Sequence, residues 1–134
     1  MGVGFKMRSR RHSRSTRERF EMLVAKALGD LPAQFRSRLE NIDVVVKDWP
    51  TPRQLAEGGL RRTDLLGLYE GVPLTERGSD YGMVPPDKIT IFRKPIEAKC
   101  HLDEEIEREI QVVVRHEIAH HLGMTDEELE RIEG

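Results

Sequence analysis

The stretch from Val114 to Asp126 constrains the fold and the chemistry more than any other part of the chain; it reads V-R-H-E-I-A-H-H-L-G-M-T-D. His116 and His120 are four residues apart, so on an α-helix they lie on one face, about one turn apart, and both imidazoles can reach one ion. Neutral imidazole is a common zinc ligand, and a catalytic zinc site typically takes three protein ligands. The spacing therefore predicts a helix that carries two ligands of a metal site.

Further residues extend this pattern to H-E-x-x-H-x-x-G-x-x-D. Glu117 projects beside the metal face, from where its carboxylate can take a proton from a water molecule on the metal. Gly123 can adopt the positive φ that ends a helix and turns the chain back. Asp126 then returns a carboxylate toward the ion as a third ligand. The alternative is that Asp126 only favours the first turn of a last helix, which Thr125 and Glu128 would begin as a capping box.

The rest of the chain alternates between helix and strand patterns. Apolar spacing predicts a helix that Ser15 or Thr16 caps and that runs to about Gly29, a short helix from Pro32, and a helix from an N-cap at Asp103 to Leu122. Short β-branched runs predict strands at 42–47, 65–70 and 88–93. The segment 75–87 is rich in glycine, proline and charge, and we expect a long surface loop there.

Composition limits the class of protein. The chain has 134 residues, of which 37% are hydrophobic and 34% charged, which predicts one modest core under a charged surface. No apolar run approaches the roughly 20 residues that span a bilayer, and no signal-peptide pattern follows the N-terminus. A cytoplasmic protein without membrane contact is expected. Cys100 is the single cysteine, which excludes an intrachain disulfide, and we expect a small buried thiol rather than a ligand.

Charge is distributed unevenly although the net charge is only −2. Residues 1–19 are rich in arginine, whereas residues 103–134 are rich in aspartate and glutamate. We expect residues 1–15 to form a flexible basic arm and residues 16–134 to form a single domain. As alternatives, the arm could attract the acidic end of the chain or touch nucleic acid.

The chain resembles the zincins, which are metallopeptidases built on a helix with H-E-x-x-H, and more closely the minimal bacterial zincin-like family, the minizincins. The resemblance runs from about residue 65 to 132, over L-G-L-Y-E-G-V-P at 66–73, D-K-I-T-I-F-R at 87–93 and the metal helix. The spacing from His120 to Asp126 matches that of metzincins, whose third ligand is a histidine. The resemblance implies zinc held by His116, His120 and Asp126, with Glu117 as the catalytic base. It also implies an α+β fold with a small mixed sheet, N-terminal helices and a C-terminal metal helix.

The activity that the resemblance implies is hydrolysis of a peptide or protein substrate. Zincins hold the substrate extended along an edge strand, and Ile89–Phe92 is the segment that matches in chain order. Tyr69 and Tyr81 are candidates, by residue type alone, to stabilise the oxyanion. His121 is rotated about 100° from His120 on the helix and should not share the ligand set. His101 and His12 have no motif around them and are expected at the surface.

Two alternatives to a peptidase stay open. Few residues follow Asp126, so there is no room for the methionine-containing turn of metzincins or for a second wall of a deep cleft. This favours a metal-stabilised binding or regulatory module without turnover as one alternative. The other is a metal-dependent nuclease assisted by the basic arm, whose affinity for nucleic acid would depend strongly on salt. The substrate and the oligomeric state are left open by the sequence.

Overall fold

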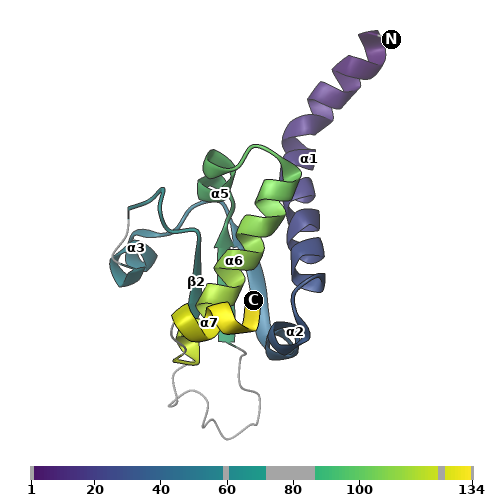
Figure 1. Ribbon diagram of the computed structural model, residues 1–134. Coiled ribbons are helices and arrows are strands. Elements are labelled where there is room, and N and C mark those ends of the chain that lie inside the picture. Colours follow the sequence, from purple (N-terminus) through teal and green to yellow (C-terminus); the bar gives the residue numbers. More distant parts are fainter. Residues whose placement is uncertain (1, 59–60, 72–86, 124–125, 134) are drawn as a thin grey trace, which may run out of the picture.

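The computed structural model describes residues 2–58, 61–71, 87–123 and 126–133, with side chains for residues 16–57, 61–71, 87–123 and 127–131. The elements in chain order are α1 (Gly2–Gly29), α2 (Ala33–Leu39), β1 (Ile42–Lys47), α3 (Pro52–Gly58), β2 (Gly67–Glu70), β3 (Asp87–Phe92), α5 (Arg93–Lys99), α6 (Asp103–His121) and α7 (Asp126–Glu133). Figure 1 shows their arrangement. The predicted α+β fold with N-terminal helices, a small mixed sheet and a C-terminal motif helix is confirmed.

The sheet has the strand order β1-β3-β2. β1 runs parallel to β3, with Val44 beside Ile89, and β2 runs antiparallel to β3, with Tyr69 beside Ile89. β3 is therefore the central strand. The prediction that Ile89–Phe92 is an edge strand for a peptide was wrong, because both edges of β3 are already paired with neighbouring strands.

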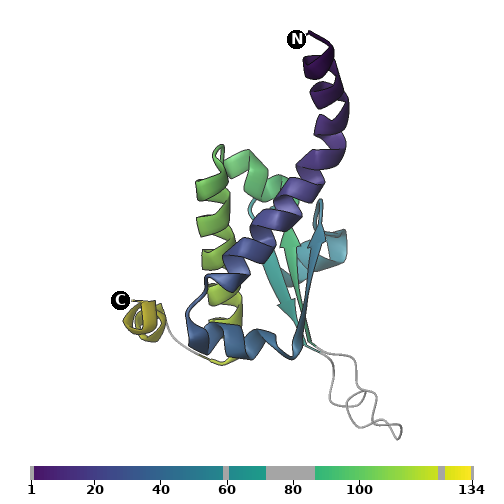
Figure 2. The ribbon, with the colours of Figure 1, turned by 90° about the vertical axis from the view of Figure 1, so that its right-hand side faces the viewer.

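α1 and α6 lie against the same face of the sheet (Figures 1 and 2). Ile89 and Ile91 of β3 are fully buried there, against the apolar face of α6. The other buried members of this core come from the two helices and their neighbours: Phe20, Leu23, Val24, Ala27, Leu31, Phe35, Ile96, Cys100, Ile106, Ile110, Val114, Ile118, Ala119 and Leu129. Cys100 is a buried free thiol, as predicted. No helix in the described ranges is long and apolar enough to cross a membrane.

α1 ends at Gly29 as predicted, but it begins at Gly2 rather than at Ser15 or Thr16. The earlier start has a physical reason. Packing of Phe20, Leu23 and their neighbours nucleates the C-terminal half of the helix, and extending an existing helix through arginine, lysine and methionine costs little free energy. The N-terminal half projects beyond the body of the protein in both views (Figures 1 and 2).

The N-terminus of α6 is capped differently from the prediction. The N-cap residue is Leu102, not Asp103. Leucine has no polar side chain, and Glu105 instead reaches back and accepts the N–H groups of Leu102 (2.9 Å) and His101 (3.1 Å). Asp103 is free of the capping role and accepts from Arg19 of α1 at 2.6 Å. Arg19 of the arginine-rich segment thus contacts Asp103, the first residue of the acidic segment 103–134.

α5, which has Pro95 in its first turn, was not predicted. Proline fits the first turn of a helix, where its missing N–H has no partner within the helix. The helix also begins with Arg93, whose guanidinium is almost fully buried and donates to Asp48 (3.0 Å) and Glu97 (3.0 Å). The hydrogen bond from Arg93 holds the pKa of Asp48 below its ordinary value. This network fixes the turn between β3 and α5.

β2 packs unusually close to α6 at Gly67. A Cβ atom placed on Gly67 would lie 2.4 Å from Cγ1 of Val113 and 3.2 Å from the carbonyl oxygen of Thr90. Only glycine permits this approach without movement of the helix or the strand. The close contact sets the separation between β2 and the half of α6 that carries the histidine motif.

Gly67→Ala is expected to lower the free energy of unfolding by about 1–3 kcal/mol, because the added methyl group overpacks the contact with Val113. Urea unfolding measures this loss, and Gly29→Ala is the matched control, since a Cβ there meets nothing within 4 Å. In the double variant Gly67→Ala/Val113→Ala, the loss should be smaller than the sum of the single losses. Additive losses would mean that the two residues do not share one contact.

Candidate metal centre

His116 and His120 lie in the last turns of α6 with their rings near one another. The ring centres are 6.0 Å apart and the ring planes meet at 71°. Zinc binds imidazole nitrogen at about 2.0–2.1 Å, so two imidazoles that share one ion have ring centres roughly 5–6 Å apart. The pair therefore has the spacing of two ligands of one ion, as the four-residue interval predicts.

The tautomer of His116 follows from its hydrogen bond. Nδ1 of His116 lies 2.8 Å from the carbonyl oxygen of Val112. A carbonyl oxygen only accepts, so Nδ1 carries the proton and Nε2 keeps its lone pair. Histidine ligands of metals commonly donate their other ring nitrogen to a backbone carbonyl in this way. The donor chemistry of His116 and His120 thus fits a zinc ion.

The predicted third ligand, Asp126, has no described side chain. Within residues 16–57, 61–71, 87–123 and 127–131, no group of three His, Cys, Asp or Glu side chains could hold one ion. Gly123 has φ 75°, the positive value that the motif predicts at the end of the helix. Asp126 then opens α7, which Leu129 anchors in the core. The side chain of Asp126 and all of Thr125 lie outside the described residues.

Glu117 is half-buried and reaches the backbone of the sheet. Its Oε1 accepts the backbone N–H of Tyr69 at 2.8 Å. Burial raises the pKa of Glu117 above its ordinary value, whereas the bond from Tyr69 acts in the opposite direction. A carboxylate whose pKa burial has raised is a better proton acceptor than an exposed one. The bond from Tyr69 to Glu117 was not predicted from the sequence.

The bond to Glu117 comes from the outer edge of β2. Phe92 N–H donates to the carbonyl of Leu66 at 2.9 Å, so the backbone groups of Leu66 and Leu68 face β3. In an antiparallel pair the alternate residues face the opposite way. The backbone groups of Gly67 and Tyr69 therefore face outward, over the half of α6 that carries the motif. The edge strand of this site is β2.

Tyr69 joins the end of α6 to the start of β3. Its ring stacks on His121, with centres 3.9 Å apart and planes at 18°. Its hydroxyl donates to Oδ2 of Asp87 at 2.6 Å, and Nε2 of His121 lies 3.8 Å from the same oxygen. His121 thus lies against Tyr69 of β2 and Asp87 of β3. The cluster of Tyr69, His121 and Asp87 was not found from the sequence.

The remaining sequence candidates have varied outcomes. The hydroxyl of Tyr69 is engaged with Asp87, and Tyr81 lies outside the described residues. His101 is exposed, as predicted, and the side chain of His12 is outside the described part of the chain.

The isolated glycine in β2 was the one available sign that β2 lies close to α6, because glycine within a strand often marks a close backbone approach.

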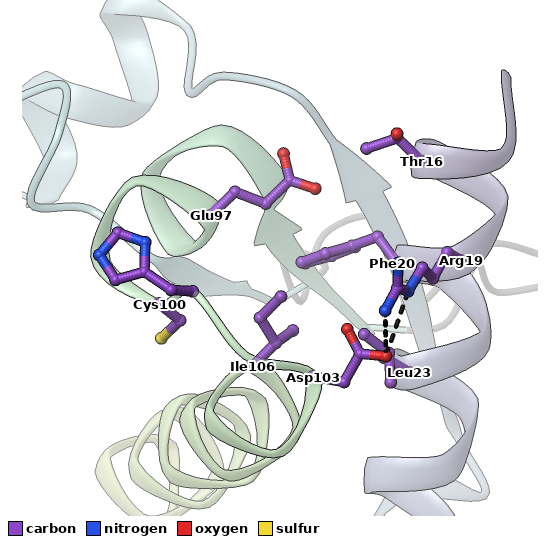
Figure 3. Close-up of a pocket in the computed structure, with 9 residues that line it drawn as sticks. Thr16, Arg19, Phe20, Leu23, Glu97, Cys100, Asp103 and Ile106 are labelled. Carbon is purple, nitrogen blue, oxygen red and sulfur yellow. Dashed lines mark hydrogen bonds and ion pairs between the residues drawn. The ribbon is translucent and has the colours of Figure 1, made fainter. Parts of the chain in front are cut away.

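A hollow of about 300 Å³ lies at the other end of α6, between α1 and the α5–α6 connection (Figure 3). Phe20 and Leu23 of α1 and Ile106 of α6 form its apolar part, and the pair of Arg19 and Asp103 lies at its rim. Ile106 precedes His116 by ten residues, or about 15 Å along a helix. The hollow is therefore separate from the candidate metal centre.

A helix with two histidines and a glutamate beneath an edge strand defines a zincin-type metallopeptidase fold. The sequence model described as zincin-like metallopeptidase matches residues 39–134, so the chain belongs to this family. The match leaves out α1 and most of α2, although both pack into the shared core. A search of curated proteins gave no match.

The buried carboxylate predicts a pH-dependent effect of Glu117→Gln on stability. The folded pKa of Glu117 lies above the ordinary 4.5, so the metal-free folded state binds this proton more tightly than the unfolded state. Stability is then lost as the pH rises from the ordinary value through the folded pKa. Metal-free Glu117→Gln, which avoids this loss, should have the larger free energy of unfolding at neutral pH.

Urea unfolding of both chains without metal, at neutral pH and below pH 4.5, checks this prediction. At the lower pH both side chains are neutral, and the advantage of Glu117→Gln should largely disappear. A difference between the two chains that is the same at both pH values would contradict the assignment to the carboxylate charge.

Proposed function

We propose that this chain is a zinc-dependent peptidase whose ligands are His116, His120 and Asp126 and whose general base is Glu117. The observation that carries the proposal is the position of Glu117. A half-buried carboxylate is held by a backbone N–H of an edge strand, one residue from the first of two histidines with the spacing of a shared ion. A structural metal site has no need of a costly buried carboxylate that does not bind the ion.

Each side chain then has one task. Zinc, when bound, supplies a Lewis acid that polarises the scissile carbonyl and makes water a better nucleophile at neutral pH. Glu117 accepts the proton of the attacking water and returns it to the leaving amine nitrogen, for which its raised pKa suits it. The hydrogen bond between Tyr69 N–H and Oε1 fixes the orientation of the carboxylate, so that Oε2 is the candidate proton acceptor.

The substrate class that fits the edge of β2 is an extended peptide. The main-chain groups of Gly67 and the carbonyl of Tyr69 face outward there, while the Tyr69 N–H is bound to Glu117. A peptide can add to such an edge by backbone hydrogen bonds to the remaining groups. β2 spans only Gly67–Glu70, so few residues of a substrate would be held in this way. The proposal thus moves the predicted substrate strand from β3 to β2.

Glu117→Gln tests the proposal directly. The amide keeps an oxygen for the Tyr69 N–H but cannot act as a base, so hydrolysis of an unstructured protein should fall by at least about a hundredfold. Zinc affinity, measured by competition with a chelating dye, should stay near that of the wild type. His116→Ala and His120→Ala should each weaken zinc binding by more than about a hundredfold, because even outer partners of ligands contribute 10–100-fold.

If the wild type binds zinc but shows no hydrolysis that Glu117→Gln removes, a binding or regulatory module is the better assignment. Near-wild-type zinc affinity of either histidine variant would reject the site itself.

Asp126 is tested separately, because the sequence leaves two roles for it. As a ligand, Asp126→Ala should weaken zinc binding by about a hundredfold or more, and Asp126→His should restore much of the loss. If Asp126 only interacts with the dipole at the first turn of α7, Asp126→Ala should lower the free energy of unfolding by no more than about 1 kcal/mol. Zinc affinity should then be unchanged. Glu127→Ala is the matched control, since Glu127 is exposed on the same turn. A larger loss of affinity in this control would place the third ligand at Glu127.

A further inference from the structure

We propose that β1 is a self-association edge, which pairs antiparallel with β1 of a second copy of this chain about a twofold axis at Val45. The two sheets would join into one, in the order β2-β3-β1 followed by β1-β3-β2 of the second copy. A twofold axis makes the same patch meet itself, so the patch must be complementary to itself. The sequence and the placement of β1 meet this condition.

β1 is an edge strand with an apolar groove beside it. It pairs with β3 alone among the strands of the described ranges. Val44, Val45 and Val46 are half-buried, and together with Val24, Ala25 and Leu28 of α1 they line a groove of about 480 Å³. Val44 and Val46 face the α1 side, where they border the core. A neighbouring strand would place its own Val44 and Val46 in this groove and bury apolar surface on both copies.

Charge complementarity selects the second copy as the partner. Asp43 and Lys47 are exposed and lie two residues on either side of Val45, so both side chains lie on the sheet face opposite the core. Antiparallel pairing about Val45 places Asp43 opposite Lys47 of the second copy, and the reverse pair follows by symmetry. Opposite charges directly across an antiparallel pair stabilise it, whereas like charges destabilise it.

Other registers lose this match. Pairing centred on Val44 would place Asp43 opposite Val45 of the second copy and Lys47 opposite Asn41. A register with Val44 opposite Val45 of the second copy would place the cores of the two copies on opposite faces of the joined sheet. Arg17 donates to the carbonyl oxygen of Val46 at 2.9 Å, but that oxygen has a second lone pair, so this contact does not prevent pairing.

The experiment is sedimentation velocity of the full chain over a range of concentrations. The highest concentration is about 100 μM, so that a dimer with a dissociation constant of this order is still detected. The wild type should form a dimer. Lys47→Asp and Asp43→Lys should each weaken dimerisation by about tenfold or more, because each sets like charges opposite one another twice. An equimolar mixture of these two variants should recover the affinity as a heterodimer, since every cross-strand pair is again of opposite charge.

Charge reversals elsewhere on the surface provide the controls. Arg53→Glu and Glu57→Lys on α3 change the net charge by the same amounts, at exposed positions away from β1. Neither control should change the dimer affinity, and their mixture should show no gain. Because Asp43 and Lys47 are exposed, all four variants should unfold at nearly the wild-type temperature, which circular dichroism verifies.

Each of three results would overturn the proposal. The first is a wild type that stays monomeric at the highest concentration. The second is a dimer that both single reversals leave intact, which would place the interface on another face. The third is a mixture of Lys47→Asp and Asp43→Lys that associates no better than either variant alone.

Discussion

The close approach of β2 to α6 is the constraint on which the candidate site depends. Gly67 lets the strand lie against Val113 at a distance that no other residue permits. Two residues further along the strand and four further along the helix, the same approach brings Tyr69 N–H to Glu117 at 2.8 Å. The strand and helix advance together from one contact to the next, so the first contact sets the geometry of the second. A side chain at position 67 would act on the site without touching it.

Apolar packing in the core offsets the unfavourable free energy of burying the Glu117 carboxylate under the sheet. Burial raises the pKa of Glu117, which means that its charge destabilises the fold at neutral pH. Val113 and Val114, one helical turn before Glu117, and Ile118, the residue after it, are all buried. Functional sites commonly keep such unfavourable groups, and the rest of the fold supplies the stability that they remove. The proposed role of Glu117 as a general base accounts for a position that packing alone does not favour.

The sequence was sufficient for features that depend on local patterns. β1 spans Ile42–Lys47 as its β-branched run predicts, and Gly123 has the positive φ that the motif requires. The order of strands could not be read in the same way, because β3 becomes central only through pairing with two segments that are distant in sequence. The partner of Glu117 could not be predicted either, because it is a backbone N–H, and every residue except proline has one. The sequence does contain an isolated glycine, Gly67, in that strand. Such a glycine indicates that another segment approaches closely, but it does not identify α6 as that segment.

Among the described strands, β2 and β1 form the two edges of the sheet, and different elements lie beside them. The outer edge of β2 lies over the histidine motif, and one of its N–H groups is already bound to Glu117. The outer edge of β1 lies beside α1 and far from the motif in the strand order, with β3 between them. In a twofold sheet joined through β1, the two β2 strands stand at opposite ends. Pairing there would remove the exposed β1 edges, which are a general hazard for aggregation, and would leave both candidate metal centres accessible to an extended peptide.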